Sequence, residues 1–142
     1  MNDTLCSVAA DYAWYSRIWI CTSFANHPAQ IVTALCLNYN IHIDTCVGLA
    51  ANMIGVSKAI IAIRDEKRFL LLYNPVITMH SLTYYDTEEG CLSLAGKRPC
   101  RRYDWVEVKY EDENFHKKRK RFQGFTAEII QHEMDHLEGI LI

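Results

Sequence analysis

Residues 131–136 read Gln-His-Glu-Met-Asp-His, and this short run restricts the fold and the chemistry of the chain more than any other. Two histidines four positions apart lie on the same face of an α-helix, about one turn from each other. At that spacing the imidazoles of His132 and His136 can bind one metal ion, and the carboxylate of Glu133 can reach a water molecule beside it. The run therefore predicts a metal-binding helix.

The flanking sequence predicts a helix over residues 126–137. Thr126 suits the N-cap position, and Phe125 and Ile130 occupy the two positions of a hydrophobic staple. Gly139 follows where a left-handed residue often ends a helix. Ile130 and Met134 fall on the face away from the two histidines, so we expect that face to pack into the core.

A catalytic metal usually has three protein ligands and water, so a third ligand must come from elsewhere. Cys91 stands out within residues 89–93, because the preceding glycine allows close backbone approach and a thiolate is a soft ligand. Spacing alone leaves other interpretations open. Cys91 could be a small buried hydrophobic residue, and the motif histidines could lie on the surface. The remaining candidate histidines are His27, His42, His80 and His116.

The rest of the pattern predicts an α+β fold with mainly antiparallel sheets packed around the C-terminal HExxH helix. A helix is expected near residues 28–40, where Pro28 suits the first helical position. Residues 56–63 read as a buried strand, and residues 69–73 as its return strand. A β-hairpin is expected from residues 105–110 and 116–122.

The bulk composition fits a single domain spanning residues 1–142. Half of the 142 residues are apolar, which is enough for a core at this size. A net charge of −2 argues against specific nucleic-acid binding, and no apolar stretch is long enough to span a membrane.

Residues 1–24 lack the basic start of a signal peptide. The six cysteines form no CxxC pair, so we expect reduced thiols and a cytoplasmic location.

Three segments in order resemble the signature of the peptide deformylase family. They are Val47-Gly48-Leu49-Ala50-Ala51 with Ile54-Gly55, then Glu89-Gly90-Cys91-Leu92-Ser93, and finally Gln131-His132-Glu133-Met134-Asp135-His136-Leu137-Glu138-Gly139. The dipeptide Asn74-Pro75 also matches the family's layout. The resemblance covers roughly residues 28–142 of this chain.

The resemblance implies a bacterial, cytoplasmic hydrolase that removes the formyl group from N-formylmethionyl peptides or nascent chains. It implies one divalent metal, natively Fe(II) and replaceable by Zn, Ni or Co, with Cys91, His132 and His136 as ligands. Glu133 would move the proton of the attacking water. The backbone N–H of Leu92 would donate to the developing oxyanion.

The family also implies where the peptide binds and what supports the metal site. The peptide would add as a strand along Val47, Gly48 and Gly90, with Leu92 beside it. Glu89 would pair with an arginine to hold the Cys91 loop. Arg102 is the best candidate, although the register across residues 98–102 leaves that choice open.

The chain departs from the family at two positions, which marks it as a divergent, deformylase-like member. Met53 stands where the family has a glutamine whose amide donates to the formyl oxygen, and a thioether cannot donate. Cys46 stands where the family has glycine, so it could be merely tolerated, narrow the peptide entrance or act as a fourth ligand. Asn52 offers an amide, but adjacent residues of a strand face opposite ways.

Two other interpretations compete with an active deformylase. A deformylase homologue could bind metal and N-terminal peptides with little or no turnover, and Met53 is the feature that favours it. A zinc endopeptidase would need a ligand downstream of His136, where only Glu138 remains. The basic run at residues 117–121 suggests a weak ribosome contact, but a solvated hairpin strand is the better interpretation.

Overall fold

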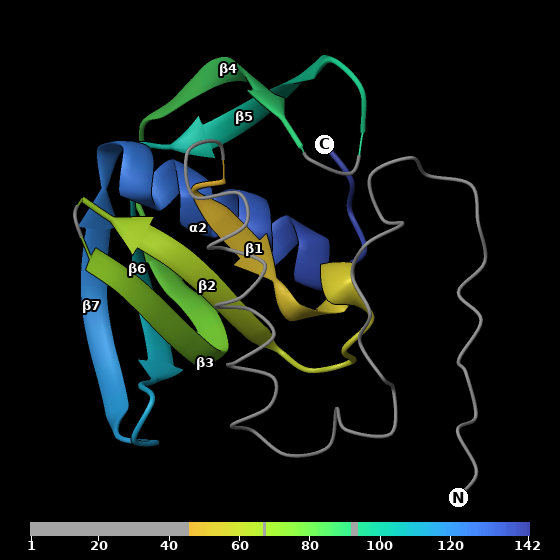
Figure 1. Cartoon of the computed structure of the whole chain (residues 1–142). Helices are drawn as coiled ribbons and strands as arrows, with labels where there is room; N and C mark the ends of the chain where they lie inside the picture. The colour runs from red at the N-terminus through yellow and green to blue at the C-terminus, as the bar shows by residue number, and fades with distance from the viewer. Residues whose placement is uncertain (1–45, 67, 92–93) are drawn as a thin grey trace, which may run out of the picture.

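The protein is represented by a computed structural model that describes residues 46–66, 68–91 and 94–142 (Figure 1). The helix expected near residues 28–40 lies outside the described residues, as do residues 1–24 and Leu92. The prediction of one domain over residues 1–142 therefore stays a prediction.

Within the described residues, seven strands form two antiparallel sheets. The larger sheet has the order β1-β2-β3-β6-β7, and β4 and β5 form a separate hairpin. The strands of the larger sheet are β1 (Gly48–Ala50), β2 (Ile60–Asp65), β3 (Arg68–His80), β6 (Trp105–Glu111) and β7 (Lys117–Gln123). The hairpin consists of β4 (Tyr84–Gly90) and β5 (Lys97–Tyr103). A 3-10 helix, η2 (Ala51–Ile54), follows β1, and the α-helix α2 (Gly124–Leu137) follows β7.

Strand β2 is apolar on both faces because each face packs into a different hydrophobic cluster. Ile61 and Ile63 belong to the cluster that also contains residues of α2, whereas Ile60 and Ala62 belong to a second cluster. The expected return strand is confirmed, since β3 pairs antiparallel with β2. The strand begins at Ile60 and not at Val56, because backbone hydrogen bonds within residues 56–60 form turns there.

The expected hairpin of β6 and β7 is confirmed, and it explains the basic run on β7. Three of the cations have acidic partners, and Arg121 lies 3.8 Å above the Trp105 ring. The pairs are Lys118 with Asp112, Arg119 with Glu107 and Lys120 with Asp65. Exposed pairs of this kind contribute little stability. These contacts are what we expect of a solvated hairpin strand.

Helix α2 begins two residues before the expected start, and the predicted cap and staple are wrong. The N-cap residue is Gln123, which makes no side-chain capping bond. The Thr126 hydroxyl donates instead to Asp65 over 3.1 Å, and Phe125 is 62% exposed, so it packs against no staple partner. The helix can start early because Gly124 adopts a φ of 57° at the turn out of β7. Gly139 has the expected left-handed conformation.

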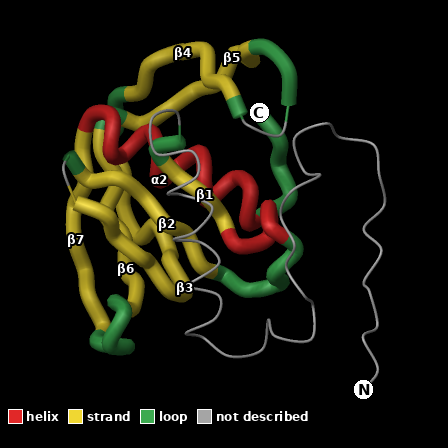
Figure 2. Tube along the Cα trace, viewed as in Figure 1, coloured by secondary structure: helices red, strands yellow, loops and turns green. Residues whose placement is uncertain are grey.

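Helix α2 lies between the two sheets, as Figures 1 and 2 show. Its inner face packs on the larger sheet through Ala127, Ile129 and Ile130, with Met134 at the edge of the same cluster. The β4–β5 hairpin covers the other side. The predicted α+β fold with antiparallel sheets around the HExxH helix is therefore confirmed. Among the described residues, none of the helices has the length and hydropathy of a membrane span.

Candidate metal centre

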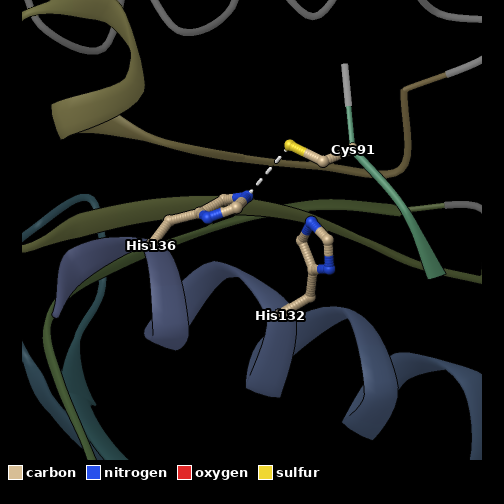
Figure 3. A group of neighbouring side chains, drawn as sticks. All are labelled: Cys91, His132 and His136. Atoms are coloured by element: carbon tan, nitrogen blue, oxygen red, sulfur yellow. Dashed lines mark hydrogen bonds between the residues drawn. The ribbon is translucent and has the colours of Figure 1, made fainter. Parts of the chain in front are cut away.

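The two motif histidines and the predicted cysteine come together at one point. His132 and His136 project from the same face of α2 toward Cys91, which directly follows β4 (Figure 3). Their ligand atoms all lie within 4.8 Å of one another, and the Cys91 Sγ is 3.3 Å from His136 Nε2. Within the described part of the chain, no other group of three such residues could hold a metal ion.

The second nitrogen of each imidazole has its own partner. His132 Nδ1 lies 2.7 Å from a carboxylate oxygen of Glu89, and His136 Nδ1 lies 3.0 Å from the main-chain oxygen of Ile140. An acceptor at Nδ1 favours the tautomer that carries its proton there. Both Nε2 atoms are then available to a ligand on the Cys91 side, which is the usual arrangement around metal-binding histidines.

Glu89 is held in turn by Arg102. The guanidinium donates two hydrogen bonds of 2.7 Å to the Glu89 carboxylate and a third of 2.7 Å to Asp135 on α2. Burial alone would raise the pKa of Glu89, but hydrogen bonds from Arg102 and His132 lower it to about 2. Burial lowers the pKa of His132, but hydrogen bonds to Cys91 and Glu89 raise it to about 10. The carboxylate thus makes His132 a more basic ligand.

Other contacts dock the β4–β5 hairpin on α2 and so fix where Cys91 lies. The Gln131 amide makes two bonds to the main chain of Tyr103, of 2.9 and 3.1 Å. The Tyr85 hydroxyl donates to Glu128 over 2.6 Å. Sequence reasoning gave Gln131 no role of its own, although it lies in the motif. A buried amide beside two ligands is a signal for such a main-chain contact.

Glu133 is buried and lies against β1. Its side chain is 5% exposed, and the Ala50 backbone N–H donates to its carboxylate. Burial raises the pKa of Glu133 to about 7, against the lowering effect of the two neighbouring histidines. A carboxyl group with a pKa near neutrality can both accept and return a proton, which is what a general base needs.

Gly48 makes room for the Glu133 carboxylate. A Cβ atom at Gly48 would lie 2.5 Å from Glu133 Oε1 and 2.7 Å from Ile129 Cγ2. Both distances are too short, so any side chain at this position displaces the carboxylate or the helix. Sequence reasoning assigned Gly48 to peptide binding alone. The structure adds a packing reason for glycine that only the three-dimensional contact reveals.

We expect Gly48→Ala to lower kcat by roughly 10²-fold while metal binding persists. A displacement of about 1 Å in a catalytic group can have that effect, and the three atoms nearest to the added methyl group belong to Glu133 and Ile129, not to the candidate ligands. Steady-state kinetics and metal analysis of the purified variant test this. A variant with wild-type kcat would show that the Glu133 position tolerates the shift.

The two residues that depart from the family pattern, Cys46 and Met53, lie near this site, as does Asn52, which precedes Met53. The Cys46 thiol is buried and donates to the Gly48 carbonyl oxygen over 2.9 Å. Met53 is partly buried and packs against the core cluster under α2. The expectation that Asn52 sits on a strand is wrong, because residues 51–54 form η2. The Asn52 amide donates to the main-chain oxygen of His136.

The donor set suits a transition metal. One thiolate and two imidazoles are soft to borderline ligands, and three protein ligands leave a position open for water or substrate. The hydrogen-bond partners of the two Nδ1 atoms orient both rings and leave both Nε2 atoms available. These residues therefore fit one divalent ion, although the ligand types do not select between iron and zinc.

Comparison with known proteins identifies the family. A profile described as polypeptide deformylase matches residues 21–142. The chain belongs to the peptide deformylase family. A peptide deformylase from Clostridium beijerinckii is 54% identical over 101 residues, which cover 71% of this chain and 74% of that protein. The deformylase interpretation, and with it a metal-dependent hydrolase family acting on formyl-methionyl peptides, is confirmed at the level of the family.

More distant deformylases share the fold. A Met-Ala-Ser-bound deformylase from Acinetobacter baumannii superposes with a TM-score of 0.74 at 31% identity, covering 86% of this chain and 84% of that one. A deformylase from Picosynechococcus is 39% identical over 67% of this chain. The matched region spans only 54% of that longer relative. Shared ancestry therefore covers the whole metal centre.

Proposed function

We propose that this chain is a metal-dependent deformylase that hydrolyses the N-formyl group of formylmethionyl peptides. The observation that supports this most directly is the grouping of Cys91, His132 and His136 beside the buried Glu133. Family membership gives the reaction class, and this grouping supplies the residues that the reaction requires.

In the proposed reaction, water attacks the formyl carbon and the C–N bond breaks to give formate and a free amine. Cys91, His132 and His136 would hold one divalent ion, which would lower the pKa of a water molecule and polarise the formyl carbonyl. Glu133 takes a proton from the attacking water and passes it to the leaving nitrogen. The backbone N–H of Leu92, which lies outside the described residues, is proposed as an oxyanion donor.

The substrate is proposed to add as a strand at the edge formed by β1, where β2 is the only described neighbour. The Arg64 N–H donates to the Val47 carbonyl over 2.8 Å, so these two residues form a hydrogen-bonded pair. In an antiparallel ladder, the polar groups of the next residue then point away from the partner strand. Gly48 therefore offers its N–H and C=O to a peptide, with Gly90 on the opposite side of the proposed channel.

Cys46 competes with such a peptide for the Gly48 carbonyl. Burial raises the pKa of its thiol to about 11, and the Glu133 carboxylate adds to the effect, so the S–H stays protonated. We expect Cys46→Gly to lower KM for a formylated peptide about threefold to tenfold with little change in kcat, since a weak hydrogen bond is worth roughly 1 kcal/mol. Saturation kinetics measure both constants. An unchanged or higher KM would contradict this role of Cys46.

Fe(II) is the proposed native ion, with Zn, Ni or Co as substitutes, and formylated nascent chains are the proposed substrates in a bacterial cytoplasm. The thiolate and imidazole ligands are compatible with each of these metals. A ribosome contact through residues 117–121 has little support, because three of those cations have acidic partners in the same chain.

The proposed function is tested with formyl-Met-Ala-Ser as substrate. The protein is stripped with a chelator and reloaded under anaerobic conditions with Fe(II), or in air with Ni(II), and formate release is measured. Turnover that disappears in the stripped protein and returns on reloading supports the proposal. Absence of turnover with every ion, in folded and metal-loaded protein, would refute it.

The second candidate is a peptide-binding homologue with little or no turnover, and Met53 is the observation that favours it. Equilibrium binding of Met-Ala-Ser distinguishes the two. Binding of this peptide by the loaded protein, combined with no release of formate, would identify the chain as a binding module.

A further inference from the structure

The main-chain carbonyl of His136 accepts two hydrogen bonds at the end of α2. One comes from the Gly139 N–H over 2.9 Å, within the turn that closes the helix. The other comes from the side-chain amide of Asn52, which lies 84 residues earlier in the sequence. Asn52 thus joins η2 to the last turn of the helix that carries both candidate histidine ligands.

The same turn determines how the His136 ring is oriented. Gly139 adopts a φ of 79°, and the Ile140 N–H donates to the Asp135 carbonyl over 2.9 Å. This return of the chain brings the Ile140 carbonyl to 3.0 Å from His136 Nδ1. The acceptor that orients the His136 ring therefore belongs to the same turn in which the His136 carbonyl is bonded to Asn52.

The other atoms of Asn52 indicate that its amide N–H is the useful group. Within the described part of the chain, its Oδ1 is buried and has no hydrogen-bond partner. A buried amide oxygen without a partner is unfavourable, so an apolar side chain would serve simple packing better. Ala51 and Ile54 are buried within η2, and the Gly55 N–H bonds to the Asn52 carbonyl over 3.1 Å. The backbone that carries the amide is therefore held in place.

We propose that Asn52 is a positioning residue for His136. It holds the His136 carbonyl, and with it the turn that presents the Ile140 carbonyl to His136 Nδ1. Without the amide, the turn relaxes, the Ile140 carbonyl no longer holds the Nδ1 proton in place, and the His136 ring loses its fixed orientation toward the ligand group. The inference relies on the proposed function only in taking His136 as a metal ligand.

His132 provides an internal comparison. Its Nδ1 partner is the Glu89 carboxylate, which Arg102 holds from the opposite side of the site. None of these contacts involves Asn52. Loss of the Asn52 amide should therefore disturb His136 and leave the Nδ1 proton of His132 in place, whereas general destabilisation would affect both.

The first measurement uses the whole chain loaded with Zn(II). Nitrogen–proton NMR correlations of the imidazoles report which ring nitrogen of each histidine carries a proton and how fast that proton exchanges with water. We expect the wild-type His136 to keep a slowly exchanging proton on Nδ1, and Asn52→Ala and Asn52→Asp to exchange it faster at His136 alone. Asn74→Asp is the matched control, because its exposed amide donates to Glu111 over 3.3 Å, outside the metal centre.

The second measurement is the release of Zn(II) from loaded protein to a chromogenic chelator. Loss of a residue that orients a ligand typically weakens metal binding about 10- to 100-fold. We expect release from both Asn52 variants to accelerate by about that factor, and release from Asn74→Asp to match the wild type. Neither measurement depends on deformylation, so failure here and failure of the proposed activity remain distinguishable.

Three outcomes would overturn the proposal. One is a wild-type His136 that carries its proton on Nε2. This observation needs no variant, so it applies even if the substitutions prevent folding. Another is variants that melt at lower temperature while exchange of the His136 Nδ1 proton and Zn(II) release stay at wild-type values, because Asn52 would then act on stability alone. The third is an equal change at His132 and His136.

Discussion

Glu133→Gln should lower kcat for a formylated peptide by about 10²–10⁴-fold, the range that a positioned general base supplies. The carboxylate is buried against Gly48 and Ala50, whereas Glu89, which also reaches a candidate ligand, is bonded to His132 Nδ1 and to Arg102. Glutamine preserves the volume and one acceptor oxygen, but it cannot take the proton of the attacking water. The loss should therefore fall on kcat, with KM nearly constant.

The measurement is steady-state hydrolysis of formyl-Met-Ala-Ser by metal-loaded wild type and variant, with metal content determined for each. Glu113→Gln is the matched control, since it makes the same change at an exposed position in the β6–β7 turn. Wild-type kcat in Glu133→Gln, at equal metal content, would assign proton transfer to another group.

The ligand group was predictable because its signal is local. The spacing of His132 and His136 fixes a helix face, and a family resemblance points to Cys91. The residues that hold these ligands gave much weaker signals. Asp135 shares Arg102 with Glu89, and this contact depends on how the β4–β5 hairpin packs on α2. No spacing rule links residues that meet only through tertiary packing.

The strand boundaries show the same division between local and tertiary causes. Strand β3 continues through Asn74-Pro75 to His80. It can continue because the pairing with β6 shifts register between Tyr73 and Val76, and Asn74 adopts a φ of 49° in the bulge. A bulge leaves residues outside the regular ladder, where the missing N–H of proline costs nothing. Such a shift is decided by the partner strand.

Met53→Gln should raise kcat, by about 10- to 10³-fold, if the missing amide is the main defect of the site. Met53 lies in η2 directly after Asn52, whose amide is already bonded to the His136 carbonyl. Among the described residues of η2, no neighbouring side-chain amide therefore replaces the glutamine donor that the family has at the position of Met53. Methionine and glutamine have similar volumes, so the substitution should fit the partly buried position without repacking.

The gain should appear in kcat and not in KM, because a donor aimed at the developing oxyanion acts mainly in the transition state. It should come with a modest loss of stability, since part of the new amide faces the core cluster and lacks a partner there before substrate binds. Met53→Leu is the matched control, as it keeps an apolar side chain of similar size and should leave kcat unchanged. Equal kcat values for Met53→Gln and Met53→Leu would show that the site has another oxyanion donor, or that its limiting step is not the one that stabilises the oxyanion.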